Sequence, residues 1–147
     1  MTKRILLADD DVDDRLLFEE VFSDLPVGEY ELISVANGQE VLNHLITYDA
    51  PNLIVLDQNM PMLSGKETAS RIRESSHFNE IPLIIYSTYN DKSFVVDCLA
   101  MGVKAVVSKP DSFEGFVEMV NELLTHSRQF VIEPSGSPVN FKKDSFG

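Results

Sequence analysis

Residues 53–61 read Leu-Ile-Val-Leu-Asp-Gln-Asn-Met-Pro, and this run sets the pattern for the whole chain. Its first four residues are branched and apolar, which predicts a strand buried on both faces of a sheet. Asp57 follows the apolar run directly, and Pro61 ends it because proline has no N–H to give to a neighbouring strand. The run therefore predicts a parallel strand with a carboxylate at its C-terminal end, where open α/β sheets bind ligands.

The composition fits one globular domain in a reducing compartment. The chain has 147 residues, of which 44% are hydrophobic, enough for a core. Twelve basic against 24 acidic residues give a net charge of −12, which argues against direct contact with nucleic acid or an anionic membrane. Cys98 has no second cysteine to pair with, no apolar run approaches the ~20 residues of a membrane span, and the stretch before Asp9 is too short for a signal-peptide core. We therefore expect a cytoplasmic protein.

Apolar runs and helical spacings alternate along the chain. The expected strands are residues 4–8, 30–35, 53–56, 83–86 and 105–107, and the expected helices are residues 12–23, 39–46, 64–74, 91–101 and 113–125. Such alternation predicts a parallel sheet with right-handed crossovers. Residues 30–35 are the most polar run and should form an edge, which the strand order 2-1-3-4-5 satisfies. Its switch point lies between the first and third strands, so Asp9, Asp10 and Asp57 should lie side by side.

The last 21 residues, 127–147, differ from the rest. Loop formers fill residues 134–138, and apolar residues surround them at 130–132 and Phe141. We therefore expect one domain over residues 1–126 and a C-terminal tail over residues 127–147 that is flexible or loosely docked. No second domain is expected.

Polar residues end four of the expected strands and suggest one site. These residues are Asp9 and Asp10, Asp57, Ser87 and Thr88, and Lys109. Crowded carboxylates raise one another's pKa unless a cation intervenes, and Mg²⁺ is a hard cation that one or two carboxylates can hold. A lysine and a hydroxyl beside them complete the requirements for phosphoryl transfer to a carboxylate nucleophile.

These residues resemble a known family. Residues 5–11, 56–61 with Gly65, 86–88, Gly102 and 108–110 are similar to the motifs of the receiver domain of two-component response regulators. The resemblance covers about residues 3–126. It implies the flavodoxin-like fold, a doubly wound (βα)5 parallel sheet in three α/β/α layers, with the same order 2-1-3-4-5.

The resemblance implies a phosphoacceptor and a metal site. Asp57 would accept a phosphoryl group from the phosphohistidine of a histidine kinase. Asp10 and Asp57 would bind Mg²⁺ through their carboxylates, Asn59 through its backbone carbonyl, and Asp9 through a water molecule.

The resemblance also assigns roles at the fourth and fifth strands. Lys109 would pair with the phosphoryl oxygens, Ser87 would be the switch hydroxyl, and Thr88 would be the small residue beside the phosphoryl group. The Lys109–Pro110 bond resembles the family's cis peptide. Val106 departs from the pattern, because the family usually has an aromatic residue there whose ring moves on activation. An aromatic switch cannot operate at that position.

The implied activity is signalling by protein contact rather than catalysis of a metabolic reaction. The partners would be a sensor histidine kinase or a phosphotransfer protein, and a downstream protein that binds the face of the fourth helix, fifth strand and fifth helix; a homodimer stays open. The fourth helix has a second apolar face, formed by Phe94, Cys98 and Met101. We expect a partner or the tail to pack against this face.

Two other functions compete with this interpretation. An Mg-dependent phosphohydrolase would also form an aspartyl phosphate, but such enzymes pair the nucleophile with a second acid two residues on, where this chain has Asn59. A degenerate receiver would act only as a scaffold, but Asp57 and Lys109 are both present. We therefore expect no enzyme activity beyond self-phosphorylation and autodephosphorylation.

Overall fold

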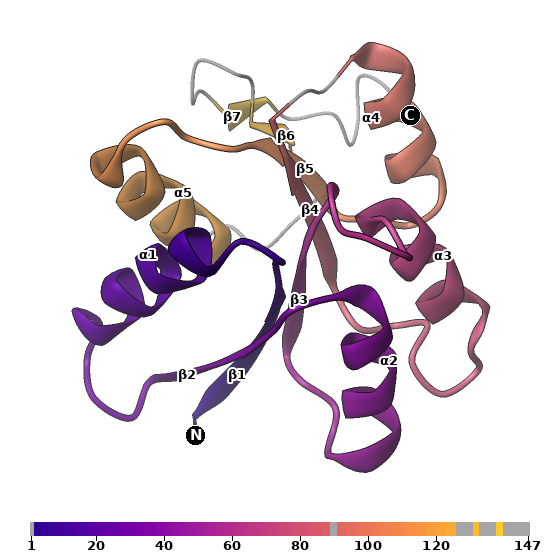
Figure 1. Ribbon diagram of the computed structural model, residues 1–147, viewed down its shortest axis with the longest axis horizontal. Coiled ribbons are helices and arrows are strands. Elements are labelled where there is room, and N and C mark those ends of the chain that lie inside the picture. Colours follow the sequence, from indigo (N-terminus) through magenta and orange to yellow (C-terminus); the bar gives the residue numbers. More distant parts are fainter. Residues whose placement is uncertain (1, 89–90, 126–130, 133–137, 140–147) are drawn as a thin grey trace.

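The computed structural model describes residues 2–88, 91–125, 131–132 and 138–139, and strands alternate with helices along them (Figure 1). The main strands are β1 (Lys3–Ala8), β2 (Tyr30–Val35), β3 (Leu53–Asp57), β4 (Leu83–Ser87) and β5 (Ala105–Ser108). The helices are α1 (Val12–Ser23), α2 (Gly38–Thr47), α3 (Gly65–Glu74), α4 (Lys92–Ala100) and α5 (Phe113–Thr125). Each of these elements lies within one residue of its expected bounds.

The five main strands are parallel and lie in the order β2-β1-β3-β4-β5, as predicted. Every residue of β3 is buried, whereas the residues of β2 are mostly half-buried. This difference matches the prediction that the most polar run forms an edge. The register pairs Ala8 with Leu56, so the next residues, Asp9 and Asp57, lie beside each other at the switch point.

Two short strands from the C-terminal tail extend the sheet beyond β5. Val131–Ile132 (β6) pairs parallel to β5, and Pro138–Val139 (β7) pairs antiparallel to β6. The sequence analysis did not predict these strands. The rest of the predicted tail lies outside the described residues, so the expectation that it is flexible or loosely docked stays a prediction.

The sheet separates two hydrophobic cores, which gives the three expected layers. Helices α1 and α5 cover one face of the sheet, and α2, α3 and α4 cover the other (Figure 1). The core under α1 and α5 contains Phe18, Tyr86 and Phe116, whereas the core under α2, α3 and α4 is mainly aliphatic and contains Val106. None of the helices in the described part of the chain is long and apolar enough to cross a membrane.

Local sequence signals place the helix that follows β3. Ser64 and Glu67 form a capping box, in which each side chain accepts the other residue's backbone N–H. Gly65 then starts α3 so close to β3 that a Cβ atom on it would lie 2.6 Å from the backbone carbonyl oxygen of Asp57. Glycine is therefore required at position 65 by close approach, and it lets α3 begin directly beside the end of β3.

Candidate functional site

Asp57 ends β3 as a buried carboxylate whose surface exposure is 1%. Its Oδ1 accepts the backbone N–H of Asn59 at 3.1 Å and lies 3.2 Å from Nζ of Lys109. Its Oδ2 is also buried but has no hydrogen-bond partner in the described structure. A buried carboxylate oxygen without a partner is costly, so this atom calls for a ligand.

Asp9 and Asp10 follow β1 next to Asp57. Asp9 is fully buried; its Oδ1 accepts the backbone N–H of Asp11 at 2.9 Å, and its Oδ2 accepts the hydroxyl of Tyr86. Asp10 is exposed. Carboxylate oxygens of Asp9, Asp10 and Asp57 all lie within 4.8 Å of one another, which confirms the predicted cluster. We call these three residues, together with Lys109, the acidic pocket.

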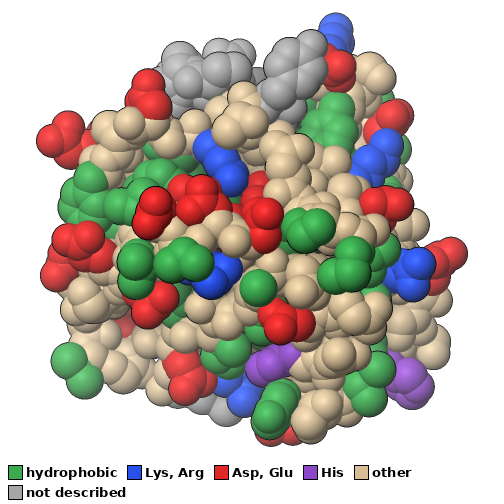
Figure 2. All heavy atoms as spheres, in the orientation of Figure 1, with side chains coloured by type: hydrophobic (Ala, Val, Ile, Leu, Met, Phe, Trp, Pro, Cys, Tyr) green, Lys and Arg blue, Asp and Glu red, His purple; other side chains and the backbone are tan. Residues whose placement is uncertain are grey.

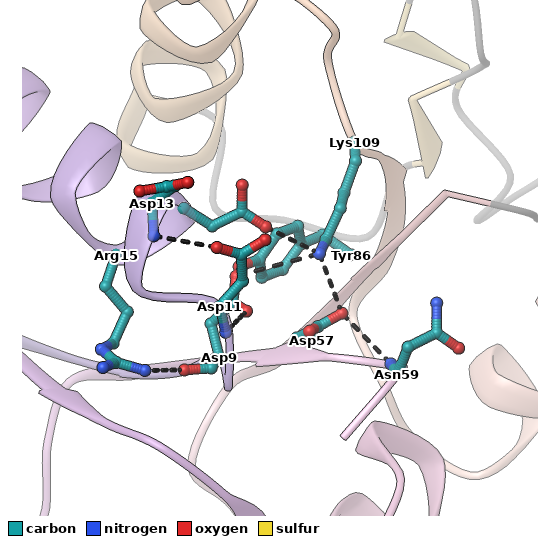
Figure 3. A network of polar contacts seen from close by, with 9 residues as sticks. Asp9, Asp11, Asp13, Arg15, Asp57, Asn59, Tyr86 and Lys109 are labelled. Carbon is teal, nitrogen blue, oxygen red and sulfur yellow. Dashed lines mark hydrogen bonds and ion pairs between the residues drawn. The ribbon is translucent and has the colours of Figure 1, made fainter. Parts of the chain in front are cut away.

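Lys109 follows β5 and reaches across the pocket (Figure 3). Its Nζ lies 2.9 Å from Oδ2 of Asp14, 3.2 Å from Oδ1 of Asp57 and 3.9 Å from Oδ2 of Asp9. Burial by itself would lower the pKa of Lys109, but its hydrogen bond to Asp14 and the charges of Asp57, Asp9 and Asp14 raise it above the ordinary value. The ammonium group therefore stays charged and offsets part of the acidic charge.

The two buried carboxyl groups hold protons more tightly than ordinary aspartates. Burial is the main cause that raises the pKa of Asp9 from 3.8 to about 8, and the charge of Asp57 adds to it. Burial also raises the pKa of Asp57, while Lys109 acts in the opposite direction. Without a cation, burial therefore favours the protonated form of both groups, and most strongly that of Asp9.

The pocket fits a hard divalent cation. Three carboxylates converge, one buried oxygen of Asp57 has no partner in the described structure, and burial raises the pKa values of Asp9 and Asp57. Oxygen ligands of this kind suit Mg²⁺, which also keeps several water molecules. Figure 2 shows acidic side chains gathered near the centre of the face turned to the viewer, with a basic side chain beside them.

The other predicted site residues lie at the same edge of the sheet. Ser87 is buried at the end of β4, and its backbone carbonyl accepts the N–H of Lys109 at 2.9 Å. Thr88 and the side chain of Asn59 are exposed. Val106 is buried in the aliphatic core under α2, α3 and α4. The Lys109–Pro110 bond is trans, so the expected cis peptide is wrong.

Sequence reasoning missed three residues that contact the pocket. The hydroxyl of Tyr86 donates to Asp9, and Arg15 donates through Nη1 to the backbone oxygen of Asp9 at 2.5 Å (Figure 3). Asp14 pairs with Lys109. Tyr86 resembles any buried strand residue in the sequence, and Asp14 resembles an acid placed for the helix dipole. A signal for Asp14 was its position one turn after the strand-end acids.

The exposed face predicted on α4 is wrong in part. Cys98 is fully buried and packs with Val95 against the aliphatic core, whereas Phe94 and Met101 are only partly buried. The face of α4 that contacts the sheet therefore runs through Val95 and Cys98, three residues apart.

Gln58, beside Asp57, accepts the backbone N–H of Lys66 through Oε1 at 2.9 Å and so helps to hold the start of α3.

The fold and the acidic pocket define a class of protein: an open α/β domain with carboxylates at the switch point of its parallel strands, and a hydroxyl and a lysine at the ends of the next two strands. The model of the response regulator receiver domain matches residues 5–121. This chain therefore belongs to the response regulator receiver domain family, a family of two-component signal transduction whose members bind Mg²⁺ or Mn²⁺ at an acidic pocket.

Curated relatives cover most of the domain. The two-component response regulator ARR17 of Arabidopsis thaliana is 30% identical over 117 residues, which are 72% of this chain and 74% of that protein. The chemotaxis protein CheY1 of Helicobacter pylori is 28% identical over 73% of this chain and 85% of its own length. The match to the probable transcriptional regulator ycf27 of Cyanophora paradoxa is 32% identical and spans 48% of that longer protein.

Solved structures share the fold. The Mn²⁺-bound form of response regulator Rcp1 has a TM-score of 0.77 and 25% identity, covering 86% of this chain and 95% of its own. The bacteriophytochrome response regulator RtBRR has a TM-score of 0.67 and 31% identity, covering 84% and 78%. The resemblance stated from sequence motifs is thereby confirmed, and phosphoacceptor signalling is the function consistent with it.

Proposed function

We propose that Asp57 accepts a phosphoryl group from the phosphohistidine of a sensor histidine kinase or a phosphotransfer protein. The observation that carries this proposal is the unpartnered, buried Oδ2 of Asp57, with a lysine on the same carboxylate and two further acids beside it. A carboxylate oxygen of Asp57 attacks phosphorus, the P–N bond breaks, and the imidazole nitrogen leaves with the electron pair. The product is an acyl phosphate on Asp57.

The remaining pocket residues support this transfer by position and charge. Asp10 and Asp57 would hold Mg²⁺ through carboxylates, Asn59 through its backbone carbonyl, and Asp9 through water; bound there, Mg²⁺ would neutralise the phosphoryl oxygens. Lys109 already lies against Asp57 and needs little movement to pair with a phosphoryl oxygen. Ser87, at the end of β4, would donate its hydroxyl, and Thr88 would lie beside the group.

Phosphorylation would then change association with a downstream protein. The surface proposed for this contact is the face of α4, β5 and α5, where Val96 and Phe113 are exposed apolar residues. A shift in population between two packings at this face would be driven by the difference in ligand contacts. Efficient phosphohydrolase activity is not favoured, because Asn59 occupies the place where such enzymes have a second acid.

A small phosphodonor tests the proposal. The protein is incubated with acetyl phosphate and Mg²⁺, and intact mass is followed together with released inorganic phosphate. We expect the mass of one phosphoryl group to accumulate, and we expect none in EDTA. Many phosphates released per protein without a labelled species would indicate a hydrolase, and no label under any condition would indicate a scaffold; either result overturns the proposal.

A further inference from the structure

The side chain of Tyr86 contacts both Asp9 and Lys109 of the acidic pocket. Its hydroxyl donates to Oδ2 of Asp9, and Nζ of Lys109 lies 4.8 Å from the centre of its ring (Figure 3). Tyr86 and Asp9 are both fully buried, so water does not compete for this hydrogen bond. One aromatic side chain therefore links the two residues that flank Asp57.

Aromatic residues of α1 and α5 hold the ring of Tyr86 in place. Phe18 of α1 packs edge-on against it with ring centroids 5.4 Å apart, and Phe116 of α5 packs edge-on against Phe18 at 5.5 Å. Such edge-to-face pairs hold aromatic rings in defined orientations. The phenol oxygen is thereby held at one position, and the carboxylate that it contacts is held with it.

Asp9 has both carboxylate oxygens engaged. Oδ1 accepts from the backbone N–H of Asp11, and Oδ2 accepts from the phenol of Tyr86. A carboxylate held by two donors cannot rotate freely toward an ion, which suits the role of binding Mg²⁺ through water. Donors of this kind also orient the carboxylate. Removing a hydrogen-bond partner of a direct metal ligand commonly weakens metal binding 10–100-fold, and for Asp9, which would act through water, we expect the lower end of that range.

We propose that Tyr86 is a positioning residue of the metal site: its hydroxyl orients Asp9 for Mg²⁺ bound in the acidic pocket, while its ring supports Lys109. This inference rests on the proposed function, because it assumes that Mg²⁺ binds beside Asp57. Tyr86 reaches the metal site from β4, on the side of the sheet that α1 and α5 cover. The residue acts through Asp9 and touches neither phosphoryl group nor metal.

The test compares two tyrosine variants. Tyr86→Phe removes the hydroxyl and keeps the ring, with its contacts to Phe18 and Lys109. Tyr30→Phe is the matched control, because Tyr30 also lies on a strand and packs edge-on against a phenylalanine, Phe22, outside the pocket. Mg²⁺ dissociation constants are measured by isothermal titration calorimetry, and melting temperatures are measured in EDTA.

We expect Tyr86→Phe to raise the Mg²⁺ dissociation constant about 10-fold, and we expect Tyr30→Phe to leave it unchanged. A purely structural role would lower the melting temperature in EDTA without changing Mg²⁺ affinity. Unchanged or tighter Mg²⁺ binding by Tyr86→Phe would overturn the inference while the proposed function stands. If the unaltered protein binds no Mg²⁺, the proposed function fails and this inference fails with it.

A second measurement needs no variant and covers the case in which Tyr86→Phe does not fold. The chain has no tryptophan and four tyrosines, so ring-labelled tyrosine gives few NMR signals. On addition of Mg²⁺, the ring carbon signals of Tyr86 should shift, while those of Tyr30 should stay in place. A Tyr86 signal that does not respond to saturating Mg²⁺ would contradict a contact with the metal site through Asp9.

Discussion

Two lysines of this protein each contact an aspartate and an aromatic ring, but one lies at the surface and the other is largely buried. Lys66 pairs with Asp97 at 3.4 Å, and its Nζ lies 6.0 Å from the ring centre of Phe94, on the surface between α3 and α4. Lys109 pairs with aspartates in the acidic pocket and lies over the ring of Tyr86. The side chain of Lys66 is 38% exposed, whereas that of Lys109 is 13% exposed.

The difference shows that burial, rather than the set of residue types, creates the site. At the surface, water screens the lysine–aspartate pair, and such pairs contribute about 0–1 kcal/mol. In the pocket, burial raises the pKa of Asp9 and Asp57 and makes each charge depend on its neighbours. We therefore propose that a cation and a phosphoryl group bind at the buried lysine–aspartate group and not at the surface pair.

The largest expected effect is the loss of the buried lysine charge. Lys109→Met keeps most of the side-chain volume but leaves Asp9, Asp14 and Asp57 without their cation. Breaking a buried ion pair by removing one partner is strongly destabilising, and we expect a loss of about 3 kcal/mol in the free energy of unfolding. Urea unfolding in EDTA measures this loss.

Lys66→Met is the matched control for that comparison. It removes the surface charge next to Asp97, and the free energy of unfolding should change by less than about 1 kcal/mol. Equal losses in the two variants would show that burial does not distinguish the two lysines.

The second effect is a pH dependence of the metal-free protein. Folded Asp9 keeps its proton up to a pKa of about 8, whereas an ordinary aspartate loses it near 3.8, so the folded state binds more protons between these values. Stability in EDTA should therefore fall as pH rises through this window, and burial of Asp57 acts in the same direction. We expect the melting temperature to be higher at pH 6 than at pH 8 by roughly 5 °C.

Two controls assign that slope to the pocket. Asp9→Asn removes the titrating group and should flatten the dependence between pH 6 and pH 8. Saturating Mg²⁺ should reduce it as well, because the cation competes with protons for the carboxylates and stabilises the folded state by mass action. A slope that survives both changes would have to come from other groups.

The smallest effect is expected at the exposed acid of the cluster. Asp10→Asn keeps the shape of the side chain and removes one of three crowded charges. Because Asp10 is exposed, we expect the metal-free protein to gain only about 0.5 kcal/mol in stability. Mg²⁺ binding should weaken in the same variant. Thermal melts with EDTA and with Mg²⁺ measure both, and lower stability in EDTA would be evidence against repulsion at Asp10.

The strand ends made much of this site predictable from sequence. Asp9 and Asp57 each follow an uninterrupted apolar run. The alternation of runs and helices, together with the polarity of residues 30–35, predicts the strand order that brings them together. Lys109 was predictable for the same reason at β5. The residues that bear the pocket's charge therefore follow from periodicity and topology alone.

The neighbours of those residues could not be predicted in this way. The bond of Tyr86 to Asp9 depends on how far a side chain reaches across β3 from β4, which no local pattern encodes. On α4, spacings of three and four residues both fit a helix, so periodicity could not decide which face met the sheet, and Cys98 was predicted on the exposed face although it is buried. The strand β6 depends on pairing with β5, to which local sequence contributes little.

Intact mass after phosphorylation tests the central claim, that Asp57 is the phosphoacceptor. The unaltered protein, Asp57→Asn and Asp97→Asn are each incubated with acetyl phosphate and Mg²⁺. The unaltered protein and Asp97→Asn, which changes the surface partner of Lys66, should each gain one phosphoryl group. Asp57→Asn should gain none. Full labelling of Asp57→Asn would contradict the assignment, because the phosphoryl group would then reside on another residue.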